Sequence, residues 1–156
     1  MRPNSVLVCL RRHSIAIPML LLVSIFVNQG KTENDGNSEM KIRITFGGTQ
    51  LTATLHDSEA SREFVSMLPL TLTLRDYAAT EKVSNLPRKL STASSPAGFD
   101  PSIGDITYYA PWENLAIFYK DFSYAEGLVK LGSFDNGIEK LGKMTGQFET
   151  VFELIE

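Results

Sequence analysis

The sequence predicts a mainly β protein, either an antiparallel sandwich or a closed barrel, built from seven or eight short strands and two short helices. Three observations support this fold class. Apolar residues alternate with polar ones over many short stretches, turn residues separate those stretches, and only two segments show helical spacing. No regular alternation of strands with long helices occurs, so a parallel sheet is not expected.

The first ordered element is expected at Lys41, where the segment KIRITF alternates polar and apolar residues. Gly47-Gly48 then supplies two residues that accept positive φ, as a tight hairpin turn requires. The segment QLTATLH follows as the return strand. Together the two strands are predicted to place six side chains in the core: Ile42, Ile44, Phe46, Leu51, Ala53 and Leu55.

A short helix is predicted next, because Asp57 or Ser58 can cap it and Glu59 lies in its first turn. Its apolar residues recur at helical spacing and are Ala60, Phe64, Val65 and Leu68. Pro69 is expected to end this helix. The segment LTLTLRDY alternates again as a strand, with three leucines on one face, and EKVSNL is a further short strand.

Residues 85–104 form one predicted loop with three prolines, two glycines and four serines. A loop of this length in a compact domain is often functional. The strands DITYYA and LAIFYKD follow, joined by PWEN, and then the strand LVKLGSF. Asp135 or Asn136 is predicted to cap the second short helix, and QFETVFELIE to form the last strand. The two helices are expected to close the two open ends of the fold.

The first forty residues differ from the rest of the chain. Basic residues at Arg2, Arg11 and Arg12 precede the apolar run 15–27, which has the pattern of a signal peptide. We therefore divide the chain into a hydrophobic N-terminal segment (1–30), a flexible linker (31–40) and one domain (41–156). Three interpretations remain open. A cleaved signal implies an exported domain, an uncleaved segment implies a membrane anchor, and a start at Met40 implies a cytoplasmic protein.

Composition excludes several functions for the domain. From Lys41 onward the chain has 11 basic and 15 acidic residues, a net charge of −4, with no basic cluster. This charge argues against nucleic acid or an anionic membrane surface as a partner. The only cysteine, Cys9, precedes the domain. The domain therefore has no disulfide and no thiol nucleophile, and with His56 as its only histidine it is not expected to hold a metal or another cofactor.

Three long segments carry a resemblance to a known family: MLPLTLTLRDYAATEKVSNLPRKLST, PAGFDPSIGDITYYAPWENLAIFYKDF and GLVKLG. They resemble the bacterial cyclophilin-like proteins, and the resemblance spans roughly residues 41–156. It implies a cyclophilin-like closed antiparallel β-barrel of about eight strands with a short helix at each end. The prolyl isomerase motifs of true cyclophilins, Phe-His-Arg and Gln-Gly-Gly-Asp, do not occur here. No catalytic residue is therefore assigned, since a shared scaffold does not fix an activity.

The leading functional hypothesis is a non-catalytic, monomeric or weakly dimeric module that binds an extended peptide or a small ligand. One alternative is a divergent prolyl isomerase in which Arg88 supplies the hydrogen-bond donor. Another is an accessory domain that docks onto a flavodoxin-like redox partner, with an exposed apolar patch in place of a ligand pocket. The resemblance suggests this second alternative, because related domains occur beside flavodoxin-like domains.

The predicted site comes from the aromatic segment 104–122 and the loop before it. Tyrosine and tryptophan suit binding sites because a rigid apolar ring carries a hydrogen-bonding edge. An arginine beside such rings recognises carboxylates or carbonyls. We expect Tyr108 and Tyr119 to form the floor of the groove, with Trp112 at its rim. The predicted ligand-binding residues are Arg88, Tyr108, Trp112, Tyr119, Glu81 and Tyr77.

Overall fold

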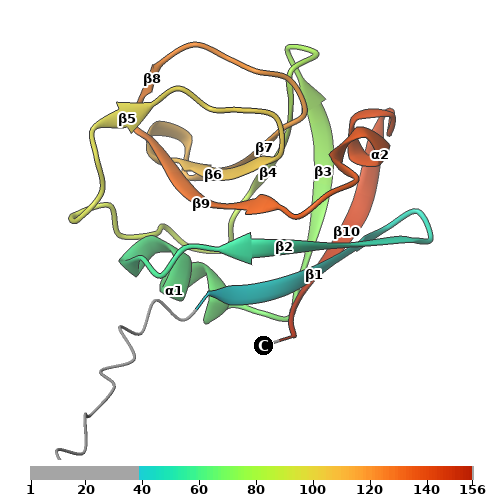
Figure 1. Cartoon of the computed structure of the whole chain (residues 1–156), viewed down its shortest axis with the longest axis horizontal. Coiled ribbons are helices and arrows are strands. Elements are labelled where there is room, and N and C mark those ends of the chain that lie inside the picture. Colours follow the sequence, from blue (N-terminus) through green and yellow to red (C-terminus); the bar gives the residue numbers. More distant parts are fainter. Residues whose placement is uncertain (1–38, 156) are drawn as a thin grey trace, which may run out of the picture. The chain divides into compact units, whose positions relative to one another are not determined.

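The computed structural model describes residues 39–155, and eight of its strands close into an antiparallel barrel (Figure 1). The order of strands around the barrel is β1-β10-β3-β4-β7-β6-β9-β2. Their bounds are β1 Met40–Phe46, β2 Thr49–Leu55, β3 Leu70–Tyr77, β4 Glu81–Asn85, β6 Asp105–Tyr109, β7 Asn114–Phe118, β9 Leu128–Phe134 and β10 Gln147–Leu154. The predicted closed barrel is confirmed. The segment 1–30 and nearly all of the linker lie outside the described residues.

The predicted hairpin and its core residues are also confirmed. Gly47 and Gly48 both have positive φ, 49° and 77°, and they join β1 to β2. All six alternating side chains predicted to be internal are buried, and Ile42, Ile44, Ala53 and Leu55 have no exposed surface. The period of two therefore fixes which face of each strand enters the core.

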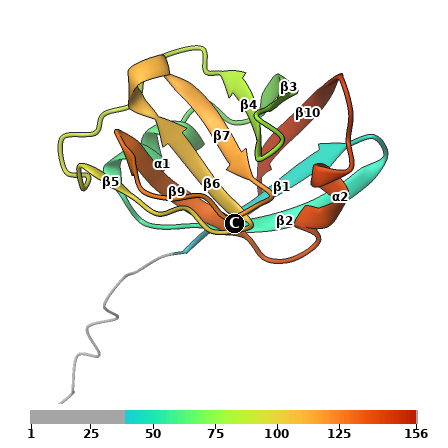
Figure 2. The ribbon, with the colours of Figure 1, turned by 90° about the horizontal axis from the view of Figure 1, so that it is seen from above.

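Two short helices lie at opposite ends of the barrel (Figure 2). Helix α1 (Glu59–Val65) begins at Ser58, whose Oγ accepts a hydrogen bond from the Ser61 amide. Its Phe64 is fully buried and packs edge-to-face against Phe152 of β10, with ring centroids 6.0 Å apart. Helix α2 (Ile138–Gly142) contributes the buried Leu141 to the same core. Among residues 39–155, no helix is both long enough and apolar enough to span a membrane.

The cap of α2 differs from the sequence-based prediction. Its first residue is preceded by Gly137 in the left-handed region, with no side-chain cap, instead of by Asp135 or Asn136. The carboxylate of Asp135 instead accepts hydrogen bonds from Thr52 Oγ1 and Thr54 Oγ1 of β2, at 2.6 and 2.7 Å. These bonds and the salt bridge to Lys41 fix Asp135 to the sheet, so it is not available to the helix.

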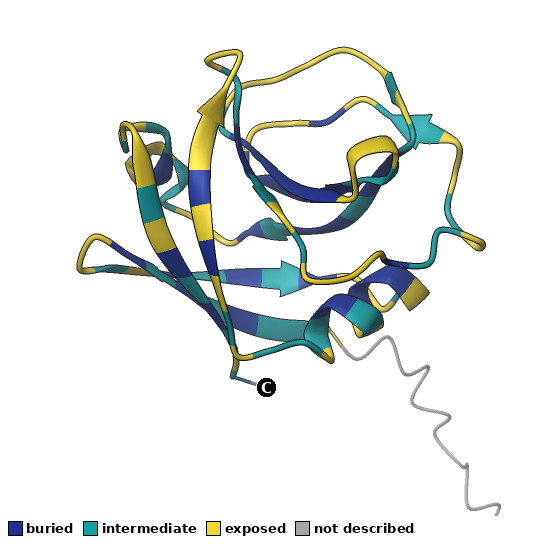
Figure 3. Ribbon diagram, turned by 180° about the vertical axis from the view of Figure 1, so that it is seen from behind, coloured by how far each residue is buried: buried dark blue, intermediate teal, exposed yellow. Residues whose placement is uncertain are grey.

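One side of the barrel is covered and the other is open to solvent. Strands β3 and β10 alternate between buried and exposed positions (Figure 3), whereas every residue of β7 and four of the five in β6 are buried. The cover over the outer face of β6 and β7 includes a small sheet of β5 (Gly98–Phe99) and β8 (Ala125–Glu126). A second apolar cluster lies there, outside the barrel core, and consists of Val83, Ala116, Phe118 and Leu128 with Phe99, Tyr109 and Ala125.

Candidate ligand-binding site

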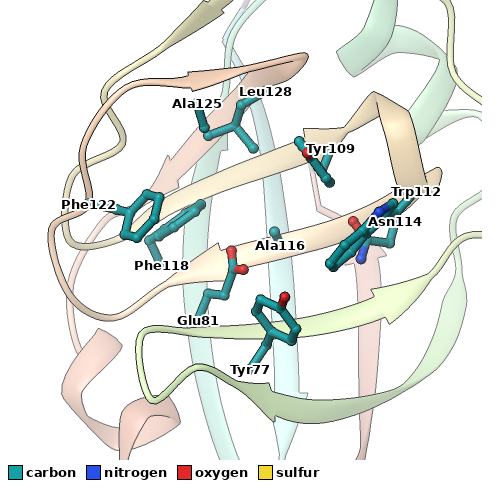
Figure 4. Close-up of a pocket in the computed structure, with 10 residues that line it drawn as sticks. All are labelled: Tyr77, Glu81, Tyr109, Trp112, Asn114, Ala116, Phe118, Phe122, Ala125 and Leu128. Atoms are coloured by element: carbon teal, nitrogen blue, oxygen red, sulfur yellow. The ribbon is translucent and has the colours of Figure 1, made fainter.

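A cavity of about 270 Å³ opens beside this second cluster, on the outer face of β4, β7 and β6 (Figure 4). Most of its wall is apolar, and its ten lining residues come from β3, β4, β6, β7, β8, β9 and the segments that follow β6 and β7. They are Tyr77, Glu81, Tyr109, Trp112, Asn114, Ala116, Phe118, Phe122, Ala125 and Leu128. A concave apolar cavity with few polar groups is the usual form of a small-ligand site.

The turn between β6 and β7 positions Trp112 at the rim of this cavity. Residues Ala110–Trp112 form a single 3-10 turn, with Pro111 near its start, and Glu113 follows in the left-handed region at φ 53°. Gly127 permits a close approach here, because a Cβ at that position would lie only 2.8 Å from Cδ of Pro111. The turn holds the Trp112 ring over the strands, with 53% of the residue still exposed.

Three of the rings meet at Trp112. Its indole packs edge-to-face with Tyr77 of β3, at 5.5 Å between centroids, and with Tyr109 of β6, at 5.4 Å. Phe118 and Phe122 stack at 6.2 Å on the opposite side of the cavity (Figure 4). Because aromatic pairs at these distances stabilise each other's orientation, the rings form a partly preformed wall.

Among residues 39–155, Glu81 is the only acidic residue that lines the cavity. It pairs in register with Tyr77 on β3 and with Phe118 on β7, so its side chain emerges on the outer face of the sheet between aromatic rings. Its carboxylate makes no hydrogen bond or salt bridge within residues 39–155. Burial among these apolar groups disfavours the charged form and raises the pKa of Glu81 to about 7.

Asn114 supplies a second polar group without a partner. The residue is 3% exposed, lines the cavity, and its Oδ1 has no hydrogen-bond partner among the described residues. A buried amide oxygen without a partner costs about 1–3 kcal/mol. Because Oδ1 has almost no accessible surface, it lies behind the cavity wall, and a ligand reaches it only if neighbouring side chains move.

The structure brings three of the predicted site residues, Tyr77, Glu81 and Trp112, together in the cavity. It places Tyr108 in the barrel core, with no exposed surface, where its hydroxyl accepts a hydrogen bond from the Leu90 amide at 3.3 Å. Tyr108 therefore does not form the predicted groove floor. Its neighbour Tyr109 faces the cavity, as the alternation of a strand requires.

Tyr119 and Arg88 also lie away from the cavity. Tyr119 donates a hydrogen bond to Asp76 Oδ1 at 2.6 Å, and its ring lies 4.9 Å from Lys82 Nζ. Arg88 donates from Nη2 to the Glu63 carbonyl at 3.0 Å and to Ser66 Oγ at 2.6 Å, which ties the long loop to α1. Its guanidinium therefore has a structural role in this conformation and does not border the aromatic wall.

Sequence reasoning missed Tyr109, Asn114, Phe118 and Phe122 as lining residues. A signal was present for two of them. Ile106 and Tyr108 share one face of β6, and Leu115 and Ile117 share one face of β7. Assigning these residues to the core would have placed Tyr109 and Phe118 on the outer face. The same alternation places Asn114 on the outer face with Phe118, but the sequence analysis began this strand at Leu115 and assigned Asn114 to the turn. Phe122 has no such signal, because it lies in the segment after β7.

No group of three or more histidine, cysteine, aspartate or glutamate side chains arranged to hold a metal ion occurs in residues 39–155. The cavity offers aromatic rings, one carboxyl group and one amide.

Comparisons with known proteins agree with the observed barrel. The sequence profile of the Cyclophilin-like family matches residues 44–153. No curated protein gives a significant match to the chain. The solution structure of a hypothetical protein from Archaeoglobus fulgidus is similar, with a TM-score of 0.57 and 18% sequence identity over 77% of this chain and 98% of the other. At this identity the similarity shows the fold alone.

Proposed function

The chain belongs to the cyclophilin-like family, and we propose that its domain is a non-catalytic binding module that holds a small ligand, or one side chain of an extended peptide, in the aromatic cavity. The observation that supports this most strongly is the Glu81 carboxylate, which lines the cavity among aromatic rings and makes no hydrogen bond or salt bridge within residues 39–155. Groups left unsatisfied at a stability cost are frequent at functional sites.

The exposed apolar residues support the same location. Six large hydrophobic residues of the described chain are exposed, and three of them, Tyr77, Trp112 and Phe122, line the cavity. Exposed aromatic rings gathered around one concavity are typical of a binding surface. The cavity is slightly smaller than the ~300–1,000 Å³ usual for drug-sized ligands, so it suits a small molecule or a single side chain.

The two alternatives receive less support. A divergent prolyl isomerase relied on Arg88 as a donor beside the aromatic wall, but Arg88 binds Glu63 and Ser66 of the α1 region. A purely accessory docking domain was expected to lack a pocket, whereas this domain has an aromatic cavity. We therefore propose ligand binding without catalysis.

The proposed function is tested by screening the full chain against a set of cationic, anionic and neutral fragments and short peptides. Trp112 is the only tryptophan of the chain, so its fluorescence reports directly on this cavity. We expect at least one class to change its emission. Ligand-observed NMR should show that the same compounds bind Tyr124→Ala, an exposed residue outside the lining, and fail to bind Trp112→Ala. Equal binding to both variants would contradict the proposed site.

Export of the domain is a separate proposal, supported by the basic and apolar pattern of residues 1–30. The N-terminal sequence of the mature protein recovered from cells would test it. A start beyond residue 27 in an extracytoplasmic fraction is the expected result, and an intact Met1 or a start at Met40 in the cytoplasm would contradict it.

A further inference from the structure

We propose that the ligand of this cavity is a small organic ammonium ion, held with its alkyl groups against the aromatic rings and its charge beside the Glu81 carboxylate. This inference rests on the proposed function and names the chemical class of the ligand. Three features of the described residues carry it: the ring arrangement, the absence of a basic residue from the lining and the size of the cavity.

The ring arrangement favours a cation. Five aromatic side chains line the cavity, and three of them converge at Trp112 from β3, β6 and the turn after β6. The faces of aromatic rings carry partial negative charge, so a cation placed against them is attracted electrostatically. Alkylated ammonium ions suit such sites especially, because they present apolar methyl groups around a spread positive charge.

The cavity contains a carboxylate, and no basic residue among 39–155 lines it. Lys82, the residue after Glu81, bonds Asp76 Oδ1 and the Met144 carbonyl at 2.7 Å each. Arg75 of β3 lies opposite Val83 on the face that carries Tyr77 and Glu81, but it is exposed, does not line the cavity and forms no salt bridge with Glu81. Glu81 itself forms no salt bridge within residues 39–155. The charge that this site lacks is therefore positive.

The volume narrows the class further. Asn114 lines the cavity, but its Oδ1 has almost no accessible surface, so the Glu81 carboxylate is the charged acceptor that a ligand meets there. A volume of about 270 Å³ accepts a head group of a few heavy atoms more readily than an extended apolar chain.

A competing interpretation is that Glu81 is protonated and donates a hydrogen bond to a carbonyl ligand. Burial raises the pKa of Glu81 to about 7, so both forms are accessible near neutral pH. The two interpretations predict opposite changes of ligand affinity with pH. A cation binds the ionised form and gains affinity as the pH rises through 7, whereas a carbonyl ligand binds the protonated form and loses affinity.

The test compares two probes of the same shape. Choline carries a trimethylammonium group, and 3,3-dimethyl-1-butanol replaces the charged nitrogen with carbon. We would titrate each into the full chain at pH 8 by isothermal titration calorimetry. Choline is expected to bind about tenfold more tightly or better, as cation–π contacts in a partly desolvated site would give. Equal binding, or tighter binding of the neutral probe, would overturn the inference.

The Glu81→Gln variant removes the charge while keeping the shape of the side chain. It should weaken choline binding about tenfold and leave the neutral probe within about twofold. The matched control is Asp121→Asn, which removes a nearby exposed carboxylate that accepts from the Ile103 amide and does not line the cavity. If Asp121→Asn lowers choline affinity as much as Glu81→Gln, the loss of affinity arises from long-range electrostatic attraction, and the inference is wrong.

Failure of the inference is distinguishable from failure of the proposed function. If the neutral probe or another uncharged fragment binds at Trp112 while choline does not, the cavity is a ligand site for a different class. If no probe or fragment perturbs Trp112, both proposals fail. If Glu81→Gln does not fold, the comparison of choline with the neutral probe on the unaltered chain still tests the ammonium inference.

One further pair of probes identifies the source of the ammonium group. A short peptide containing trimethyllysine is compared with free choline and with the same peptide containing the neutral, acetylated lysine. Binding of the trimethylated peptide about tenfold above choline would assign the group to a polypeptide, and equal or weaker binding would assign it to a free small molecule. Both results support the ammonium inference, and binding of the acetylated peptide alone would oppose it.

Discussion

Two carboxylates on the same hairpin, Asp76 and Glu81, have opposite environments. Asp76 lies on β3 and receives hydrogen bonds from Lys82, Tyr119 and the Ala79 amide. Glu81 lies on β4 across from Tyr77 and receives none within the described residues. The hydrogen bonds from Lys82 and Tyr119 lower the pKa of Asp76, whereas burial raises that of Glu81 to about 7. One carboxylate stabilises the barrel, and the other is held at a cost in stability.

Lys82 explains how one short strand produces both environments. Its stem is buried with the residues inside the barrel, and its Nζ reaches the end near α2, where Asp76 and the Met144 carbonyl accept its hydrogen bonds. Glu81, the preceding residue, faces the outside of the same sheet and therefore meets the aromatic cavity. A carboxylate that is hydrogen-bonded within the protein, such as Asp76, indicates a structural role. A carboxylate in a cavity without such partners, such as Glu81, indicates a site for a ligand.

The largest expected change in stability comes from removing the Asp76 carboxylate. Asp76→Ala leaves the buried Lys82 ammonium without its acidic partner and should lower the free energy of unfolding by about 2–3 kcal/mol. Urea denaturation at pH 7 measures this. Because the pKa of Asp76 is lowered, its contribution is present above the ordinary carboxyl pKa and is lost as the pH falls through the lower, folded value. An unchanged midpoint would show that Asp76 does not stabilise Lys82.

Removing the Glu81 carboxylate should have the opposite effect on stability. Since the folded pKa of Glu81 lies above the unfolded value, the folded state binds more protons between about pH 4.5 and 7, and stability falls as the pH rises through this range. Glu81→Gln should remove that decline and stabilise the domain at pH 8 by on the order of 1–2 kcal/mol. Thermal unfolding at pH 5 and pH 8 measures both effects. Destabilisation at pH 8 would mean that Glu81 has a partner in solution.

The pH dependence of binding follows from the same group. Titratable residues that line the cavity are Glu81 of β4, Tyr77 of β3 and Tyr109 of β6. Arg75 of β3 faces the same side of the sheet opposite Val83, and Glu113 pairs with Lys89 at 3.6 Å. Choline affinity should rise about five- to tenfold between pH 6 and pH 8, as the ionised fraction of Glu81 increases. Glu81→Gln should abolish this dependence. A flat profile for the unaltered chain would exclude Glu81 as the counter-ion.

Removing the Trp112 side chain is expected to lower ligand affinity and to change stability little. Trp112→Ala removes the ring that contacts both Tyr77 and Tyr109, and should weaken choline binding about tenfold, or 1.4 kcal/mol. Calorimetry on this variant and on Tyr124→Ala gives the comparison. Stability should change little, because Trp112 is half exposed. Undiminished binding would place the ligand elsewhere on the barrel.

The smallest effect is expected at Arg88. Its side chain is about half exposed and joins the long loop to α1, so Arg88→Ala should lower stability by about 0.5–1 kcal/mol and leave ligand binding within twofold. Calorimetric titration and urea denaturation measure the two quantities. A tenfold loss of binding would restore Arg88 to the ligand site predicted from the sequence.

Much of the fold could be predicted because its signals are local. The alternation in KIRITF and QLTATLH, the glycine pair between them and the Ser58 cap each act within a few residues. The burial of Lys82 could not be predicted in this way. It reverses the expected pattern of its strand, and its partners at Asp76 and Met144 become neighbours only when the barrel closes.

The site was harder to predict because the sequence does not show which face of each strand is covered. Tyr108 and Tyr109 are equally aromatic, and only the covered outer face of β6 makes the second one part of a cavity. Trp112 was expected at a rim because a turn leaves a large ring exposed, and in the structure it lines the cavity and is 53% exposed. The position of Arg88 depends on hydrogen bonds to α1 that no local pattern indicates.

The most direct measurement is the pKa of Glu81 itself, followed by the carbon-13 shift of its carboxyl group in NMR titrations with and without choline. A pKa of about 7 in the free protein that falls by about one unit when choline is present would show that Glu81 is a buried acid and that choline binds beside its ionised form. A value near that of an ordinary glutamate, unchanged by choline, would contradict both the unsatisfied carboxylate and the ammonium site.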